Sequence, residues 1–244
     1  MRLIDSALAR FGYRLTPLEA SSSGWTLDCL FALLKGLGFA PKHIVDVGAN
    51  RGFWTRTALQ HFPDAAYTLV EPQGELKVYI QDLMDRGCRI RWVHAGAGDK
   101  PGSLPFTIRE RDDASNFSAS EKEAQAAGLK RTTVEIRTLD EIVASGEFPV
   151  PEMVKIDAEG FDLKVLAGGT GLIGRTEIFL IEASLRGSWE NTVLEVMRRM
   201  AERGYDLLDV THLNRSPKYG VLWLMELAFV RRDSRLLDAA PSYE

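Results

Sequence analysis

Cysteine is scarce in this sequence, since the 244 residues include only two, Cys29 and Cys88. Two cysteines so far apart provide neither a disulfide framework nor the C-x-x-C spacing of a metal site. Long apolar runs are absent too: the longest, residues 221–230, is interrupted by Glu226, whereas a membrane-spanning helix needs about 20 apolar residues. No signal peptide is recognisable at the start of the chain. We therefore expect a cytoplasmic protein without a membrane span.

An excess of basic residues is also missing. The chain has 30 Lys and Arg residues against 34 Asp and Glu residues, with a formal net charge of -4 at pH 7, and its basic residues are scattered. Proteins that bind nucleic acids usually carry a concentrated basic patch, so we expect no nucleic-acid partner. The sequence also lacks the G-x-G-x-x-G fingerprint of dinucleotide-binding folds and a Tyr-x-x-x-Lys pair. Both absences count against a nicotinamide-dependent oxidoreductase.

The composition that is present is that of an ordinary globular chain. It is 45% hydrophobic and 26% charged, which allows one sizeable core. Apolar residues at helical spacing over 3–11 and 27–37 predict a helical N-terminal extension, residues 1–40, which would cap the rest of the chain. A single domain, residues 41–235, is expected to follow.

Strand-like and helix-like patterns alternate along this domain. Apolar runs predict strands at 44–47, 67–70, 90–93, 153–156 and 178–181, with helices at 54–62, 76–84 and 189–203. Such alternation implies a parallel sheet with right-handed crossovers. Residues 205–210 and 222–230 flank a turn-rich stretch and predict a C-terminal antiparallel hairpin. The expected fold is therefore α/β: a doubly wound, Rossmann-like, seven-stranded and mostly parallel sheet closed by this hairpin.

Residues 44–55 combine an apolar strand, a glycine turn and the start of a helix. Gly48 can adopt backbone angles closed to other residues, Gly52 permits close approach, and the helix start offers unpaired N–H groups. Such a corner is typical of nucleotide-binding sites. Here, however, the spacing is G-x-x-x-G with Asn50 inside it, and Asp46 precedes the first glycine by two residues. A carboxylate there suits a cationic amino-acid group, which points to S-adenosylmethionine.

A second acid, Glu71, follows the strand predicted at 67–70. It lies roughly 20 residues beyond the glycine turn, where a carboxylate binds ribose hydroxyls in nucleotide-binding α/β folds. The two glycines without Asp46 and Glu71 would indicate no more than a tight turn. The combination predicts a site for a nucleoside that carries a positive charge.

Five ordered blocks, over about residues 40–185, resemble the FkbM family of S-adenosylmethionine-dependent methyltransferases, which have the class I methyltransferase fold. The blocks are V-D-V-G-A-N-R-G at 45–52, E-P at 71–72, V-H-A-G-A-G-D-K-P-G at 93–102, R-T-L-D at 137–140 and V-K-I-D-A-E-G-F-D-L-K-V-L-A-G at 154–168. The last block is similar to the family signature K-I-D-x-E-G-x-E-x-x-V-L-x-G. One departure is Asp162, where the family usually carries Glu.

The resemblance implies which residues bind the cofactor. It assigns Asp46 and Gly48 to the methionine part, Glu71 to the ribose, and Ala95 and Gly96 to the rim of the adenine pocket. Asn50 and Thr55 would support the turn or contact the cofactor, and the alternative is that they only cap the following helix. The complete predicted set is Asp46, Gly48, Asn50, Gly52, Thr55, Glu71, Pro72, His94, Ala95, Gly96 and Asp157.

Methyl transfer to a hydroxyl requires alignment of the reactants and a base for the hydroxyl proton. Asp157 is the first candidate base because it ends a predicted parallel strand, and Glu159 and Glu182 are the next. These three acids are also the residue types that bind a divalent cation such as Mg²⁺. Nothing in the spacing decides between a base and a metal ligand, so Mg²⁺ stays possible but is not favoured, and no metal ligand is assigned. Lys155 and Asp162 are expected to be packing or salt-bridge residues.

Residues 109–120 form a long polar insertion that is expected to belong to a substrate lid. Within it, Ser115, Asn116, Phe117 and Ser118 would contact the cofactor pocket or the acceptor, or would simply be solvated.

The sequence therefore predicts an S-adenosylmethionine-dependent O-methyltransferase with S-adenosylhomocysteine as its product. The resemblance alone supplies the acceptor, a small-molecule or glycan hydroxyl on a sugar, glycan precursor or natural product. Two alternatives stay open. One is an NAD-dependent Rossmann-fold oxidoreductase, and the other is a non-catalytic partner protein that binds S-adenosylmethionine and has no need of Asp157 and Glu182. A homo-oligomer is compatible with the sequence.

Overall fold

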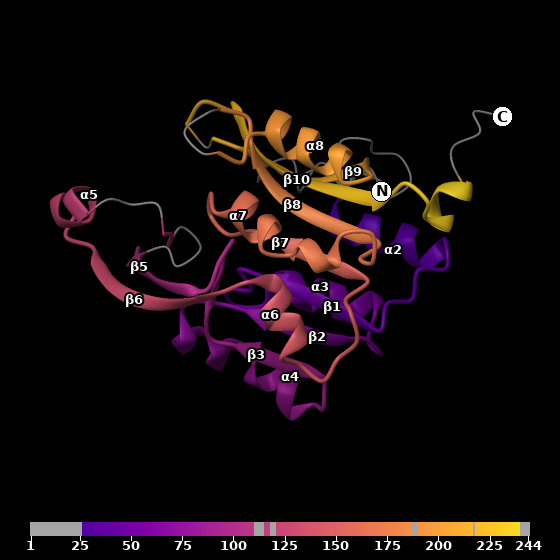
Figure 1. Ribbon diagram of the computed structural model, residues 1–244, viewed down its shortest axis with the longest axis horizontal. Helices are drawn as coiled ribbons and strands as arrows, with labels where there is room; N and C mark the ends of the chain where they lie inside the picture. Colours follow the sequence, from indigo (N-terminus) through magenta and orange to yellow (C-terminus); the bar gives the residue numbers. More distant parts are fainter. Residues whose placement is uncertain (1–25, 110–114, 118–120, 187–189, 217, 240–244) are drawn as a thin grey trace, which may run out of the picture.

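The centre of the molecule is a seven-stranded sheet with strand order β3-β2-β1-β7-β8-β10-β9 (Figure 1). The computed structural model describes residues 26–109, 115–117, 121–186, 190–216 and 218–239. The first five strands of this order are parallel, and β10 is antiparallel to β8 and β9. The strands are β1 (His43–Val47), β2 (Ala66–Val70), β3 (Ile90–Val93), β7 (Met153–Ile156), β8 (Ile178–Ser184), β9 (Tyr205–Arg215) and β10 (Leu222–Arg231). The predicted fold class is confirmed.

Helices cover both faces of this sheet, which is why its central strands are buried at every position. Successive side chains of a strand point to opposite faces, so Ile44 and Val45 belong to two different apolar clusters. The cluster around Ile44 includes α2 (Leu27–Gly36), α3 (Phe53–His61) and α4 (Gln81–Asp85). The cluster around Val45 includes α6 (Leu139–Ala144), α7 (Asp162–Ala167) and α8 (Val193–Glu202). The sheet is thus wound on both sides.

Several boundaries differ from the predicted ones. The helix predicted at 76–84 is a 3-10 helix, η1 (Gly74–Ile80), followed by the short α4. The amphipathic helix begins only at Val193, because Thr192 caps it by accepting a hydrogen bond from the Glu195 N–H. Strand β8 continues to Ser184 because β10 pairs with it that far. The helix predicted at 3–11 lies outside the described residues, and the division into an extension and a domain stays a prediction.

A second, three-stranded sheet has the order β4-β6-β5. It consists of β4 (Gly96–Ala97), β5 (Gly102–Ile108) and β6 (Lys130–Arg137), and α5 (Glu121–Ala126) precedes β6. Figure 1 shows β5, β6 and α5 extending to the left, away from the main sheet. The alternating patterns of residues 103–108 and 132–137 predict these two longer strands, but not that they pair apart from the main sheet. Within the described part of the chain, no helix has both the length and the apolar character needed to cross a membrane.

Candidate active site

A cavity lies where β1, β2 and β7 end, beside β4. Its apolar lining comes from both sheets, and its polar lining includes three carboxylates, those of Glu71, Asp157 and Glu159. Among the described residues that line it there is no lysine, arginine or histidine. The lining residues are Val47, Gly48, Asn50, Val70, Glu71, Pro72, Gln73, Ala95, Gly96, Ala97, Phe106, Ser115, Phe117, Asp157, Ala158 and Glu159. This is the edge of a parallel sheet at which ligands usually bind.

The turn after β1 requires glycine at position 48. Gly48 has a φ of 73°, and a Cβ atom there would stand 1.8 Å from the carbonyl oxygen of Asp157. Asn50 also has a positive φ, 46°, which its short polar side chain tolerates. Gly52, with a φ of 75°, leaves no room for a Cβ beside Ile80. The turn therefore brings the ends of β1 and β7 into direct contact and forms one wall of the cavity.

Asp46 is fully buried and is not among the residues that line the cavity. Its carboxylate accepts a hydrogen bond of 2.6 Å from the Thr55 hydroxyl and lies 3.2 Å from the ammonium nitrogen of Lys155. The reason is the alternation of the strand, because Asp46 shares a face with Ile44, the face that α3 covers. Asp46 and Thr55 thus support the turn from behind.

Lys155 links three parts of this wall. Its ammonium group donates a hydrogen bond of 3.0 Å to the Gly48 carbonyl and lies 3.2 Å from Asp46 and 3.3 Å from Asp157. Burial lowers its pKa, but the carboxylates of Asp157, Asp46 and Glu226 outweigh burial and raise it. The expected salt-bridge role is confirmed, since Lys155 combines one hydrogen bond with two ion pairs.

Glu71 is buried at the end of β2 and faces the cavity. One carboxylate oxygen accepts a hydrogen bond of 2.8 Å from the Asn50 N–H, and the other accepts one of 2.9 Å from the Gln73 N–H. Burial raises the pKa of Glu71 to about 7, although these two N–H groups act in the opposite direction. The carboxylate is therefore held in one orientation with part of its surface open to a ligand.

Of the residues predicted to form the rim after β3, some line the cavity and one does not. Ala95 and Gly96 line the cavity, and a Cβ on Gly96 would lie 2.6 Å from the ring of Phe117. His94, by contrast, is exposed and is not among the lining residues; its Nε2 lies 3.1 Å from the Pro72 carbonyl oxygen, within hydrogen-bonding distance. Pro72 itself lines the cavity.

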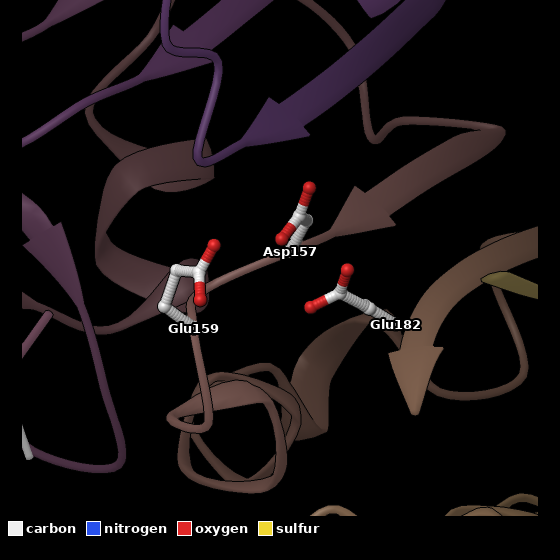
Figure 2. A group of neighbouring side chains, drawn as sticks. All are labelled: Asp157, Glu159 and Glu182. Atoms are coloured by element: carbon white, nitrogen blue, oxygen red, sulfur yellow. The ribbon is translucent and has the colours of Figure 1, made fainter. Parts of the chain in front are cut away.

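The three candidate catalytic acids lie close together: Asp157 and Glu159 line the cavity, and Glu182 lies beside them without being one of the lining residues. Figure 2 shows the carboxylates of Asp157, Glu159 and Glu182 turned toward one another, and all three lie within 4.8 Å of each other. Glu159 has a φ of 50° in the turn before Gly160. Burial, followed by the charges of Asp157, Asp162 and Glu159, raises the pKa of Glu182 far above its usual range. The Glu182 carboxyl is therefore harder to ionise than a solvent-exposed glutamate.

Asp162 holds the turn that carries Glu159. Its carboxylate accepts hydrogen bonds of 2.9 Å from the Ala158 N–H and 3.1 Å from the Gly160 N–H. The Asn191 side-chain amide donates to it at 2.7 Å and to the Glu182 carbonyl at 3.1 Å. Asp162 is fully buried, and burial raises its pKa to about 7. The sequence placed it correctly in packing, but nothing indicated Asn191.

Glu226 is a further acid near this cluster. It lies directly opposite Glu182 in the antiparallel pair of β8 and β10. The Thr211 hydroxyl donates a hydrogen bond of 2.5 Å to its carboxylate, and burial raises the pKa of Glu226 to about 7. The only sequence signal was that Glu226 interrupts an apolar run.

The fold and the site agree with one family of known proteins. The family model of the methyltransferase FkbM domain matches residues 46–207. The chain belongs to the FkbM methyltransferase family. The matched residues include every residue that lines the cavity, and the resemblance inferred from the five sequence blocks is confirmed.

The similar proteins compared with this chain are methyltransferases. This member of the FkbM family is 32% identical over 89 residues to the hexuronic acid methyltransferase AglP of Haloferax volcanii, a match that covers 34% of this chain and 37% of that relative. Among solved structures it is similar to the precorrin-6y C5,15-methyltransferase of Geobacter metallireducens (12% identity, 87% and 93% coverage, TM-score 0.45). It is also similar to the magnesium protoporphyrin IX methyltransferase of Synechocystis PCC 6803 with bound SAM (11% identity, 84% and 77% coverage, TM-score 0.48).

Part of the cavity wall comes from residues that the sequence did not single out. Gln73 lines the cavity and donates its backbone N–H to Glu71. Phe106 of β5 packs on Phe117 with ring centroids 4.7 Å apart, and both rings line the cavity together with Ser115. Phe117 and Ser115 belong to the predicted insertion, whereas Ser118 lies outside the described residues. The lid function of that insertion stays a prediction.

Proposed function

We propose that this chain is an S-adenosylmethionine-dependent O-methyltransferase that acts on a hydroxyl of a sugar, glycan precursor or natural product. The observation that carries the proposal is Glu71, which is buried at the end of β2, fixed by two backbone N–H groups and open to the cavity. A carboxylate so placed accepts hydrogen bonds from the two hydroxyls of a ribose. Membership of the FkbM family supports methyl transfer as the reaction.

The charge of the cavity argues for S-adenosylmethionine over NAD⁺. A pyrophosphate requires N–H groups or cations, whereas the described lining offers three carboxylates and no basic side chain. S-adenosylmethionine carries a sulfonium and an ammonium group, both of which acids stabilise. Since Asp46 is buried behind the turn and already bound by Lys155, we assign it the support of the turn. The carboxylates that face the cofactor are then those on the cavity wall.

Bound S-adenosylmethionine supplies an electrophilic methyl group, and the protein has to align it with the acceptor oxygen. Such alignment lowers the barrier by about 7–11 kcal/mol. The acceptor hydroxyl also loses its proton to a general base, a contribution of roughly 10²–10⁴-fold. We assign this proton to Asp157, because its carboxylate lines the cavity as the partner of Lys155, whereas Glu182 does not line the cavity and the acids around it raise its pKa. Glu159 completes the wall beside them.

The three acids are also close enough to share a divalent cation. We keep the role of base for Asp157, because Lys155 already supplies a positive charge to it at 3.3 Å. The proposed acceptor class follows the family and the hexuronic acid methyltransferase relative.

The test uses the purified protein, tritiated S-adenosylmethionine and a panel of sugars, uronic acids and polyketide alcohols, each with and without EDTA. We expect transfer to at least one hydroxyl in the presence of EDTA and a loss of about 10²-fold or more in Asp157→Asn. Glu147→Gln, an exposed acid before β7, is the control. Binding of NAD⁺ with no binding of S-adenosylmethionine in a calorimeter would refute the proposal.

A further inference from the structure

The hairpin of β9 and β10 ends in a turn that projects from the main sheet. We call residues 213–223, apart from residue 217, the hairpin end; it lies at the upper left of Figure 1. Strand β8 pairs with β10 as far as Ser184, which lies opposite Leu224, and the Leu185 N–H then donates to the Trp223 carbonyl. The turn of the hairpin therefore continues past the end of β8.

Exposed apolar side chains are concentrated at the hairpin end and directly beside it. Leu185 belongs to this surface through its hydrogen bond to Trp223. Leu194 lies there as well, because Thr192, the cap of α8, forms a bridge with Ser184. Half of the large apolar side chains that are exposed in the described part of the chain are found here: Leu185, Leu194, Leu213, Tyr219, Val221 and Trp223. Such a contiguous apolar surface is typical of an interaction site.

The charge of the hairpin end is opposite to that of the whole chain. Residues 210–225 include Arg215 and Lys218 and no acid, whereas the chain has a formal net charge of -4. Both basic side chains are exposed. Lys218 lies over the ring of the next residue, 4.9 Å from its centroid, and Arg215 donates to a backbone carbonyl, so neither contact neutralises the charge. Beside the hairpin end, the exposed Arg186 and Glu190 balance each other. The apolar surface thus carries a net positive charge.

We infer that the hairpin end docks on a membrane surface that contains anionic phospholipids. Tyrosine and tryptophan side chains favour the boundary between headgroups and acyl chains, and anionic headgroups attract lysine and arginine. A stable protein interface needs about 800 Å² from each partner, which a narrow turn does not offer, whereas a turn can enter the headgroup layer. This inference goes beyond the proposed function and does not depend on it.

Docking in this way would orient the active site. Glu182 precedes Ser184 by two residues on β8, and the hairpin end extends from the same edge of the sheet at which the cavity lies. A docked molecule therefore turns this edge toward the lipid surface. An acceptor hydroxyl carried by a membrane lipid would be presented to the cavity from that side.

The experiment is sedimentation of the full chain with two kinds of vesicle, one of phosphatidylcholine alone and one in which a third of the lipid is phosphatidylglycerol. We expect binding to the anionic vesicles at low salt, release at high salt because salt screens the attraction, and weak binding to the neutral vesicles. Lys218→Gln should weaken binding to the anionic vesicles by about fivefold. Leu213→Ser should weaken binding to both kinds of vesicle.

Each variant has a matched control. Leu207→Ser changes an exposed leucine toward the other end of β9, and Lys35→Gln changes an exposed lysine in the last turn of α2. Both should bind the vesicles as the wild type does. The comparison of the two kinds of vesicle uses the wild type alone, so it does not depend on the folding of any variant.

Three results would overturn the inference. The first is no binding to either kind of vesicle, or equal binding to both. The second is wild-type binding by both Leu213→Ser and Lys218→Gln, because another part of the chain would then make the contact. The third is a dimer of the lipid-free protein, seen by light scattering, that Leu213→Ser dissociates in place of an effect on vesicle binding. The assay contains neither a methyl donor nor an acceptor, so its failure leaves the proposed function standing.

Discussion

Replacement of Lys155 by methionine tests how much the fold depends on a single buried charge. The side chain is almost completely buried, as is that of Asp46, and their charged atoms lie 3.2 Å apart. Methionine has a similar length and keeps the apolar packing of the lysine stem. The change therefore removes the positive charge and the hydrogen bond to the Gly48 carbonyl and little else.

The expected loss of stability follows from what is left behind. Without Lys155, Asp46 keeps only the hydrogen bond from the Thr55 hydroxyl, and a buried carboxylate then lacks a compensating charge. Removal of one partner of a buried ion pair costs about 3–5 kcal/mol, a large part of the roughly 5–15 kcal/mol by which domains are stable. The double variant Lys155→Met with Asp46→Asn should regain much of this loss, because the unpaired charge is gone.

Urea unfolding followed by circular dichroism measures these differences at equilibrium. Lys77→Met, a change at an exposed lysine of η1, is the matched control and should change the free energy of unfolding by less than about 0.5 kcal/mol. If Lys155→Met costs less than about 1 kcal/mol, or if the double variant is less stable than Lys155→Met alone, the ion pair does not hold the wall as described.

Two further predictions concern the turn and the hairpin. Gly48→Ala would place a Cβ 1.8 Å from the Asp157 carbonyl oxygen. We therefore expect this variant to be destabilised by about 1–3 kcal/mol or more and to lose S-adenosylmethionine binding in calorimetry. The control variant Gly102→Ala, whose new Cβ would lie in open space, should bind S-adenosylmethionine normally. Burial raises the pKa of Glu226 to about 7, and a raised folded-state pKa of an acid gives stability that is present at low pH and lost as the pH rises through about 7. The stability advantage of the wild type over Glu226→Gln in urea unfolding should therefore shrink between pH 5 and pH 8, by at most about 1.4 kcal/mol per pH unit; a constant difference would contradict this.

The fold was predictable wherever a local pattern reports burial. The run at 153–156 is apolar apart from Lys155, and it is a central strand buried on both faces. Helix α6 was not predicted, because its six residues are too few for a periodic pattern; a capping box between Thr138 and Glu141 marks its start. The extension of β8 to Ser184 depends on pairing with β10, which no local pattern reveals.

The position of a residue on the cavity wall was predictable where that residue directly follows a parallel strand. Gly48, Glu71 and Asp157 all lie on the cavity wall, because each follows directly on a parallel strand and such strand ends meet at one edge. Phe106 was not singled out, because it reaches the cavity only through a second sheet whose position depends on long-range packing. The cofactor role of Asp46 stays a prediction: a local pattern cannot tell which face of the sheet a side chain will occupy, and Asp46 lies on the face that α3 covers.

The contact between the first turn and the end of β7 also has a consequence for how the chain folds. Lys155 and Gly48, which form this wall, are 107 residues apart in the sequence, and pairings so distant form slowly because a long loop must close first. A growing polypeptide that already contains the glycine corner and Glu71 still lacks half of the pocket until the strand at residues 153–156 has been inserted between β1 and β8. Ligand binding therefore cannot guide the early steps of folding. It reports that β7 is in place beside β1.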